Sequence, residues 1–130
     1  ATIICPWGDR GAMARTPDGL IVQSPAFGPP RVIDTLGAGD TFVAATIHKL
    51  NSAKIASEKR TENTEVNQDQ QENSQPPERQ ITRNENIESL QCSKTLFIDE
   101  STLVTAITFA CKVAGGKTGF QGFDKISFYK

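Results

Sequence analysis

Near the start of the chain, apolar residues fall into short runs separated by turn-forming residues. The runs "TIIC" (2–5) and "GLIVQSPAF" (19–27) have the length and β-branched content of strands. Between them, "PWGDRGA" and "TPDG" carry the glycine, proline and aspartate typical of loops and tight turns. The pattern predicts that the two runs form a hairpin. After the proline-rich "FGPP", the run "RVID" (31–34) predicts one more short buried strand.

Two later segments place apolar residues at helical spacing, and the first follows directly after a glycine-containing turn. In "DTFVAATIHKL", which starts at residue 40, one stripe holds Val43, Ile47 and Leu50, and a neighbouring stripe holds Phe42 and Thr46. The local order is therefore strand, glycine turn, helix.

The second helical segment lies in the last third of the chain. Its i, i+3, i+4 and i+7 positions carry Leu103, Ala106, Ile107, Ala110, Val113 and Ala114, which is the stripe of a packed helix. We expect Asp99, Ser101 or Thr102 to cap its N-terminus, and Gly115 and Gly116 to end it.

The segment between the two predicted helices differs in composition. Residues 52–95 contain no aromatic residue, carry mixed charges and are rich in Asn and Gln, so they bury too little apolar surface to offset the entropy of ordering. We predict a disordered insertion, with a charged or amyloid-prone recognition tail as the alternative. The residues on either side, 1–51 and 96–130, are predicted to form one α/β domain in which short strands pack against two helices.

Composition limits the classes of function. With 130 residues, 37% of them hydrophobic, the chain supports one core, and a net charge of -1 with a pI near 5.8 does not favour nucleic acid or an anionic membrane. No apolar run approaches the roughly 20 residues that span a bilayer, and the start has no charged region of a signal peptide. We therefore expect small-molecule partners. Because the first residues already form a predicted strand and no Met precedes them, we expect that the chain begins inside a larger protein.

Cysteine usage predicts a reducing compartment. Cys5, Cys92 and Cys111 are an odd number of widely spaced cysteines, and with the single His48 they form neither a disulfide framework nor a zinc site. A cytoplasmic location is the expectation.

The turn before the first helix carries the most specific chemistry. Gly37, Ala38 and Gly39 have almost no side chains, so an anion can approach the unpaired amides and the positive dipole end of the helix. Asp40 would repel such an anion, but it could accept the proton of a hydroxyl group that attacks a phosphoryl group. The pattern therefore indicates phosphoryl transfer to an alcohol. On spacing alone, an ordinary role in capping the helix explains Asp40 equally well.

Two other interpretations of the glycine-containing segments, as known nucleotide-binding motifs, are discounted. "GAGDTF" lacks the third glycine of the dinucleotide-binding fingerprint, and in "AGGKTG" a cysteine stands where a phosphate-binding loop needs its first glycine. Lys117 in the second motif either neutralises a phosphate or complements the dipole at the C-terminus of its helix.

The stretch "DTLGAGDTF" resembles the signature of the ribokinase-like (PfkB) carbohydrate kinases, in which a D-T-x-G-A-G-D segment joins a strand to a helix. The likeness extends to "ICPWGDRGA" and "FACKVAGGKTGFQGFD" and covers nearly all of the chain outside residues 52–95. It implies the C-terminal portion of a ribokinase-like α/β fold. It also implies a kinase, homodimeric as the whole protein, that uses ATP, Mg²⁺ and K⁺ to phosphorylate fructose at its C1 hydroxyl group.

The resemblance assigns roles to individual residues. Asp40 matches the catalytic base, and Gly37, Ala38 and Gly39 match the anion hole for the transferred phosphoryl group. The positions that match the ATP site are Gly8, Gly11, Phe27, Pro29, Phe42, Cys111 and Ala114. Asp34 matches an acid that helps to hold a monovalent cation near the nucleotide. Ordinary core roles for Phe42, Cys111 and Ala114, and a role as a strand-end acid for Asp34, are the alternatives.

The chain also departs from that family. In that family an N-terminal half, which this chain does not contain, supplies the sugar-binding residues and the magnesium-associated motif. The family also joins the two helices by a short turn, whereas this chain has residues 52–95 between them. This segment is either a tolerated surface loop or a retained noncoding segment. Because positioning supplies much of the rate of such transfers, we predict that the 130-residue chain alone is inactive or nearly so. The other functional hypotheses are a kinase of another sugar, such as ribose, and a non-catalytic nucleotide-binding or interaction module.

Overall fold

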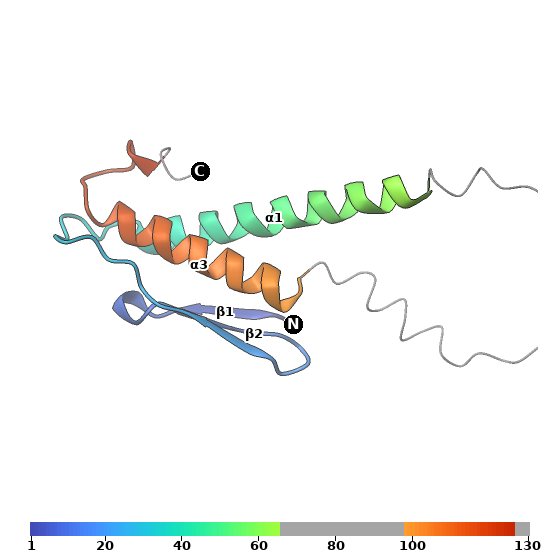
Figure 1. Ribbon diagram of the computed structural model, residues 1–130. Coiled ribbons are helices and arrows are strands. Elements are labelled where there is room, and N and C mark those ends of the chain that lie inside the picture. The colour runs from blue at the N-terminus through green and yellow to red at the C-terminus, as the bar shows by residue number, and fades with distance from the viewer. Residues whose placement is uncertain (66–97, 127–130) are drawn as a thin grey trace, which may run out of the picture.

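The fold consists of a small antiparallel sheet and two helices. The computed structural model describes residues 1–65 and 98–126 of the chain. Its elements are β1 (Ile3–Pro6), the short 3-10 helix η1 (Gly8–Arg10), β2 (Ala12–Arg15), β3 (Ile21–Ser24), α1 (Ala38–Glu65) and α3 (Glu100–Lys117). α3 lies between the sheet and α1 and contacts both of them (Figure 1). Helices packed with short strands agree with the predicted α/β class.

The sheet differs from the predicted hairpin. Its order is β1-β2-β3 with both pairings antiparallel, so the two predicted strands lie on either side of β2 and do not pair with each other. Cys5 pairs with Met13, and Ala14 pairs with Val22. β2 was missed because its sequence "AMAR" contains no β-branched or aromatic residue and therefore carries little strand propensity.

The run "RVID" is not a strand, so that prediction was wrong. Val32 and Ile33 are each 58% exposed, and residues 31–34 form no part of the described sheet. The segment is fixed instead by the end of α3, where the carbonyl oxygen of Thr118 accepts hydrogen bonds from the amides of Ile33 (2.7 Å) and Asp34 (3.2 Å).

α3 forms the centre of the core, and its predicted apolar stripe is confirmed from Leu103 to Val113, whereas Ala114 is only partly buried. Leu103, Ala106, Ile107 and Ala110 are fully buried. The sheet meets this helix with its inward-facing residues Ala12, Ala14, Val22 and Ser24, all of which are buried. Small side chains on both surfaces allow the helix to approach the strands closely.

The two ends of α3 were predicted with unequal success. The carboxylate of Asp99 caps the N-terminus by accepting a hydrogen bond from the amide of Thr102 (2.7 Å), and this bond lowers the pKa of Asp99. Gly115 and Gly116 do not end the helix, which continues to Lys117.

Of the two predicted stripes of α1, the neighbouring stripe that holds Phe42 and Thr46 is the buried one. Phe42, Ala45 and Thr46 are buried, whereas Val43 and Ile47 are 53% and 61% exposed. α1 also continues past Ser52 to Glu65, so the first residues of the predicted insertion are helical; residues 66–95 lie outside the described residues. Within the part of the chain that the structure describes, neither helix is apolar over a length that would cross a membrane.

Gly115 allows the closest approach between α3 and the loop after β3. An added Cβ at this position would overlap the carbonyl oxygen of Phe27. We therefore expect Gly115→Ala to lower the free energy of unfolding by about 1–3 kcal/mol, as overpacking does, in a urea titration. The control is Gly39→Ala in α1, where an added Cβ meets no atom within 4 Å. Equal stabilities for the Gly115 variant and the unaltered chain would contradict this prediction.

Candidate functional site

The first turn of α1 leaves two backbone amides without an acceptor among the described residues. Gly37 has a φ of +75°, a backbone conformation that favours glycine. Its carbonyl oxygen accepts hydrogen bonds from both the amide (2.9 Å) and the hydroxyl group (2.8 Å) of Thr41. The amide of Ala38 donates to the carbonyl oxygen of Thr35 (3.2 Å). Because the helical ladder begins at Thr41, the amides of Gly39 and Asp40 remain available to an anion.

A cavity of about 500 Å³ opens beside this turn. It is bordered by η1, by the loop after β3, by the start of α1 and by the C-terminal half of α3. Its lining includes Gly8, Gly11, Phe27, Ala38, Gly39, Phe42, Cys111 and Ala114. The structure thus brings six of the seven residues predicted for the nucleotide site together with two of the three predicted for the anion hole.

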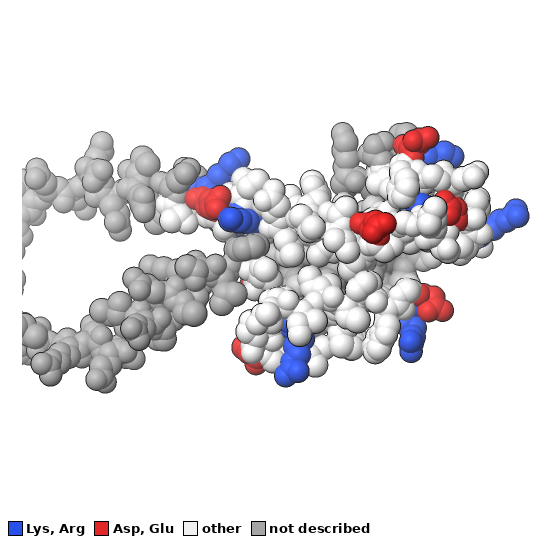
Figure 2. Space-filling view, turned by 180° about the vertical axis from the view of Figure 1, so that it is seen from behind, with Lys and Arg blue, Asp and Glu red and all other residues white. Residues whose placement is uncertain are grey.

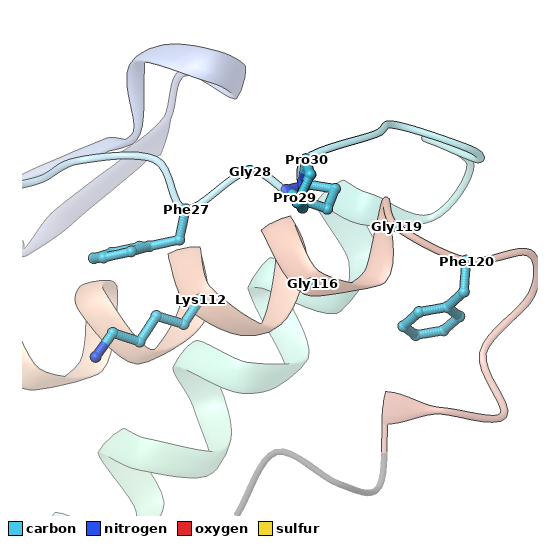
Figure 3. Close-up of a pocket in the computed structure, with 8 residues that line it drawn as sticks. All are labelled: Phe27, Gly28, Pro29, Pro30, Lys112, Gly116, Gly119 and Phe120. Carbon is cyan, nitrogen blue, oxygen red and sulfur yellow. The ribbon is translucent and has the colours of Figure 1, made fainter.

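Pro29, the seventh residue predicted for the nucleotide site, lines a neighbouring cavity of about 570 Å³ instead. Figure 3 shows that cavity, where Pro29 and Pro30 lie above the end of α3, and the side chains of Phe27 and Lys112 lie close to each other. The Lys112 ammonium group is 5.3 Å from the centre of the Phe27 ring. Phe27 borders both cavities, so the loop that contains it separates the two spaces.

Asp40 lies on the other side of the α1 N-terminus. Its side chain is exposed and lines a third cavity of about 450 Å³, together with His48, Phe109 and Phe123. Among the described residues, Asp40 takes part in no salt bridge. Adjacent residues of one helical turn, Gly39 and Asp40, therefore border two different cavities, and the amides of both have no acceptor among the described residues.

Gly37 lies outside the linings of these cavities in the described structure. The ring of Phe123 packs directly against it, and an added Cβ on Gly37 would overlap that ring. Phe123 belongs to the segment after α3, so residues far apart in the sequence meet at the start of α1.

Asp34 forms a salt bridge with Lys117, the last residue of α3. The Nζ atom of Lys117 is 2.7 Å from Oδ2 of Asp34 and 3.0 Å from the Asp34 carbonyl oxygen. The amide of Leu36 donates to Oδ1 (2.9 Å), and the amide of Gly122 donates to Oδ2 (3.3 Å). The bond from Lys117, followed by those from the two amides, lowers the pKa of Asp34.

This pKa shift predicts an acid-sensitive contact. A carboxyl group whose pKa is lowered by folding stabilises the fold above its unfolded pKa, and this contribution is lost as the pH falls through the folded pKa. We expect thermal unfolding scans of the unaltered chain to show a loss of stability below about pH 4, where the Asp34 carboxylate takes up a proton.

Asp34→Asn should flatten the pH dependence in that range, and the exposed Asp124→Asn serves as the control. If the Asp34→Asn variant and the unaltered chain lost stability in parallel as the pH fell, the contact would not be the cause.

The described part of the chain offers no cluster of His, Cys, Asp and Glu side chains that could hold a metal ion. Cys5 is exposed and Cys111 is buried, and neither forms a disulfide in the described structure. Burial raises the pKa of the Cys111 thiol, opposed by a weaker hydrogen bond with Ser24. Cys111 is thus a neutral, apolar part of the cavity wall.

No large patch of one charge sign is visible on the face that Figure 2 shows. Acidic and basic side chains lie next to each other in small mixed groups, with wide uncharged areas between the groups. This distribution agrees with the near-zero net charge of the sequence.

No protein-family model matches the chain. The chain is 34% identical over 126 residues to ketohexokinase of the mouse, Mus musculus, an alignment that covers 97% of this chain and 26% of that protein. The chain is related to one part of a kinase. It spans about a quarter of the length of the curated relative that it matches.

Sequence reasoning missed two contacts of this site. It gave Asp34 and Lys117 separate roles. The signal that could have linked them is that an acid and a lysine of opposite charge each lie close to glycine residues. It gave no role to Phe123, because an aromatic residue in a glycine-rich tail does not by itself indicate which backbone it covers.

Proposed function

We propose that this chain is the ATP-binding and catalytic portion of a ketohexokinase-like sugar kinase. In this proposal Asp40 is the general base, the start of α1 is the anion hole, and Mg-ATP is the phosphoryl donor. The observation that carries the proposal is that Gly39 and Asp40, adjacent residues whose amides have no acceptor among the described residues, line two different cavities. The similarity to part of mouse ketohexokinase supports the same class of reaction.

The nucleotide would occupy the cavity of about 500 Å³, whose size lies within the roughly 300–1,000 Å³ of small-molecule sites. Phe27, Phe42 and Cys111 offer an apolar wall for a base. Gly8 and Gly39, where an added Cβ would meet no atom within 4 Å, let the polyphosphate approach the backbone closely. The γ-phosphoryl group would then lie at the N-terminus of α1, at the positive end of the helix dipole.

The acceptor hydroxyl group would approach from the side of Asp40. As its oxygen forms a bond to the γ-phosphorus, the bond from phosphorus to the bridging oxygen breaks and ADP leaves. The hydroxyl proton passes to the Asp40 carboxylate. The negative charge on the oxygens of the transferred group is stabilised by the amides of Gly39 and Asp40.

Exposed apolar residues support the view that this portion works within a larger sugar-kinase fold. Val32, Ile33 and Leu36, which lead into the anion hole, are all more than half exposed. In the proposed whole kinase these side chains are covered, and other parts of that protein position the sugar. We therefore propose that the chain alone binds nucleotide but transfers phosphate slowly or not at all.

Two measurements test this function. Isothermal titration calorimetry with Mg²⁺ and a non-hydrolysable ATP analogue should detect saturable binding to the 130-residue chain. For turnover, the chain replaces its matching segment in mouse ketohexokinase, and ADP release is measured with fructose. Absence of nucleotide binding by a folded chain would contradict the nucleotide site. A folded, nucleotide-binding chimera without fructose-dependent turnover would contradict the catalytic role.

A further inference from the structure

The surroundings of Asp34 do not fit a monovalent cation. We propose that the Lys117 ammonium group is the permanent cation of this site, so that neither the fold nor nucleotide binding depends on K⁺. The part that concerns nucleotide rests on the proposed function, whereas the part that concerns the fold does not.

The geometry around the Lys117 ammonium group carries this inference. Lys117 is 0% exposed, although it is the last residue of α3. Nζ contacts both Oδ2 and the carbonyl oxygen of Asp34, which are two of the three oxygen atoms that this residue could offer to a bound cation. In a third direction it lies 5.2 Å from the centre of the Phe123 ring, at a distance typical of cation–π contacts.

A second cation at the same carboxylate would be unfavourable. Oδ2 already accepts hydrogen bonds from Lys117 and the amide of Gly122, and Oδ1 accepts one from the amide of Leu36. Asp34 carries one negative charge, which the buried ammonium group balances. A K⁺ ion beside Asp34 would therefore meet a fixed like charge within the same cluster.

The contact also connects this charge to the proposed anion hole. Asp34 precedes Gly37 by three residues, and the Phe123 ring that lies near Lys117 also packs against Gly37 through its outer edge. Lys117 therefore acts as a positioning residue: it fixes the path of residues 34–37 relative to the end of α3, and with it the start of α1.

Thermal unfolding of the full chain tests this proposal without any nucleotide. At equal ionic strength, the unaltered chain should show the same Tm in KCl, NaCl and tetramethylammonium chloride. Lys117→Met removes the charge and leaves room for a small ion, and should lower the Tm by about 10 °C or more. Its Tm should then be higher in KCl or NaCl than in tetramethylammonium chloride. Lys54→Met, at an exposed position of α1, is the matched control and should change neither Tm nor cation dependence.

Several results would overturn the proposal. One is a saturable stabilisation of the unaltered chain that is specific to K⁺. Another is a Lys117→Met chain whose Tm does not distinguish K⁺ or Na⁺ from tetramethylammonium. If Lys117→Met does not fold in tetramethylammonium chloride, its refolding yield in the three salts replaces Tm as the measurement, with the same expected order. If the Tm values depend on the salts as expected but the chain binds no nucleotide, the proposed function is contradicted and the proposed role of the ion pair in the fold still stands.

Discussion

Asp40→Asn is expected to lower the kcat of the chimeric kinase by about 10²–10⁴-fold and to leave its affinity for nucleotide unchanged. The amide cannot accept the proton of the attacking hydroxyl group, so the loss falls on the chemical step. Nucleotide binding should survive because the Asp40 side chain lines a different cavity from the predicted nucleotide residues. ADP release with fructose and titration with the ATP analogue measure the two effects separately.

The matched control is Glu58→Gln, which makes the same change of a carboxylate to an amide on the exposed surface of α1. It should alter neither quantity. An Asp40→Asn chimera with an unchanged kcat would favour the other interpretation of the helix start, in which Asp40 only stabilises the first turn and the chain serves as a nucleotide-binding module. The helix-cap role predicts a lower Tm without a selective loss of kcat.

The central helix was predictable from its sequence, and the sheet only in part. The α3 stripe repeats over several turns, and such a pattern has one structural solution: burial of that face. The strands are four residues long, so their pairing depends on which neighbours are present. The run "RVID" shows the same limit, since its apolar residues indicate a strand but find no partner strand among the described residues.

The face that α1 buries could not be derived from periodicity alone. Val43 and Ile47 are more apolar than Thr46, yet Thr46 is the buried residue, and its hydroxyl group donates a hydrogen bond to the carbonyl oxygen of Phe42 (2.8 Å). That internal bond removes the cost of burying the hydroxyl group. The two apolar stripes of α1 then face different surroundings, and the choice between them is made by α3, which lies against the Phe42 side.

The candidate site was predictable to the extent that it lies on continuous motifs. The glycine turn predicted an anion hole at a helix start, and the structure brings that helix start to a cavity with the predicted residues of η1 and α3. What the motifs did not contain was the connection across the chain. The contact between Asp34 and Lys117 spans 83 positions in sequence, and no local pattern specifies a pairing over that distance.

Ala114→Trp is expected to weaken binding of the ATP analogue by about 100-fold, equivalent to about 2.7 kcal/mol, while the chain stays folded. Ala114 is only partly buried and lines the cavity from α3, so the indole ring would enter the space that the proposal gives to the nucleotide. Calorimetry measures the affinity, and circular dichroism of the same sample verifies the fold. Ala56→Trp adds the same side chain to an exposed position of α1 and should bind the analogue as the unaltered chain does. Undiminished affinity in a folded Ala114→Trp chain would place the nucleotide elsewhere, because a cavity filled by indole cannot also hold a base.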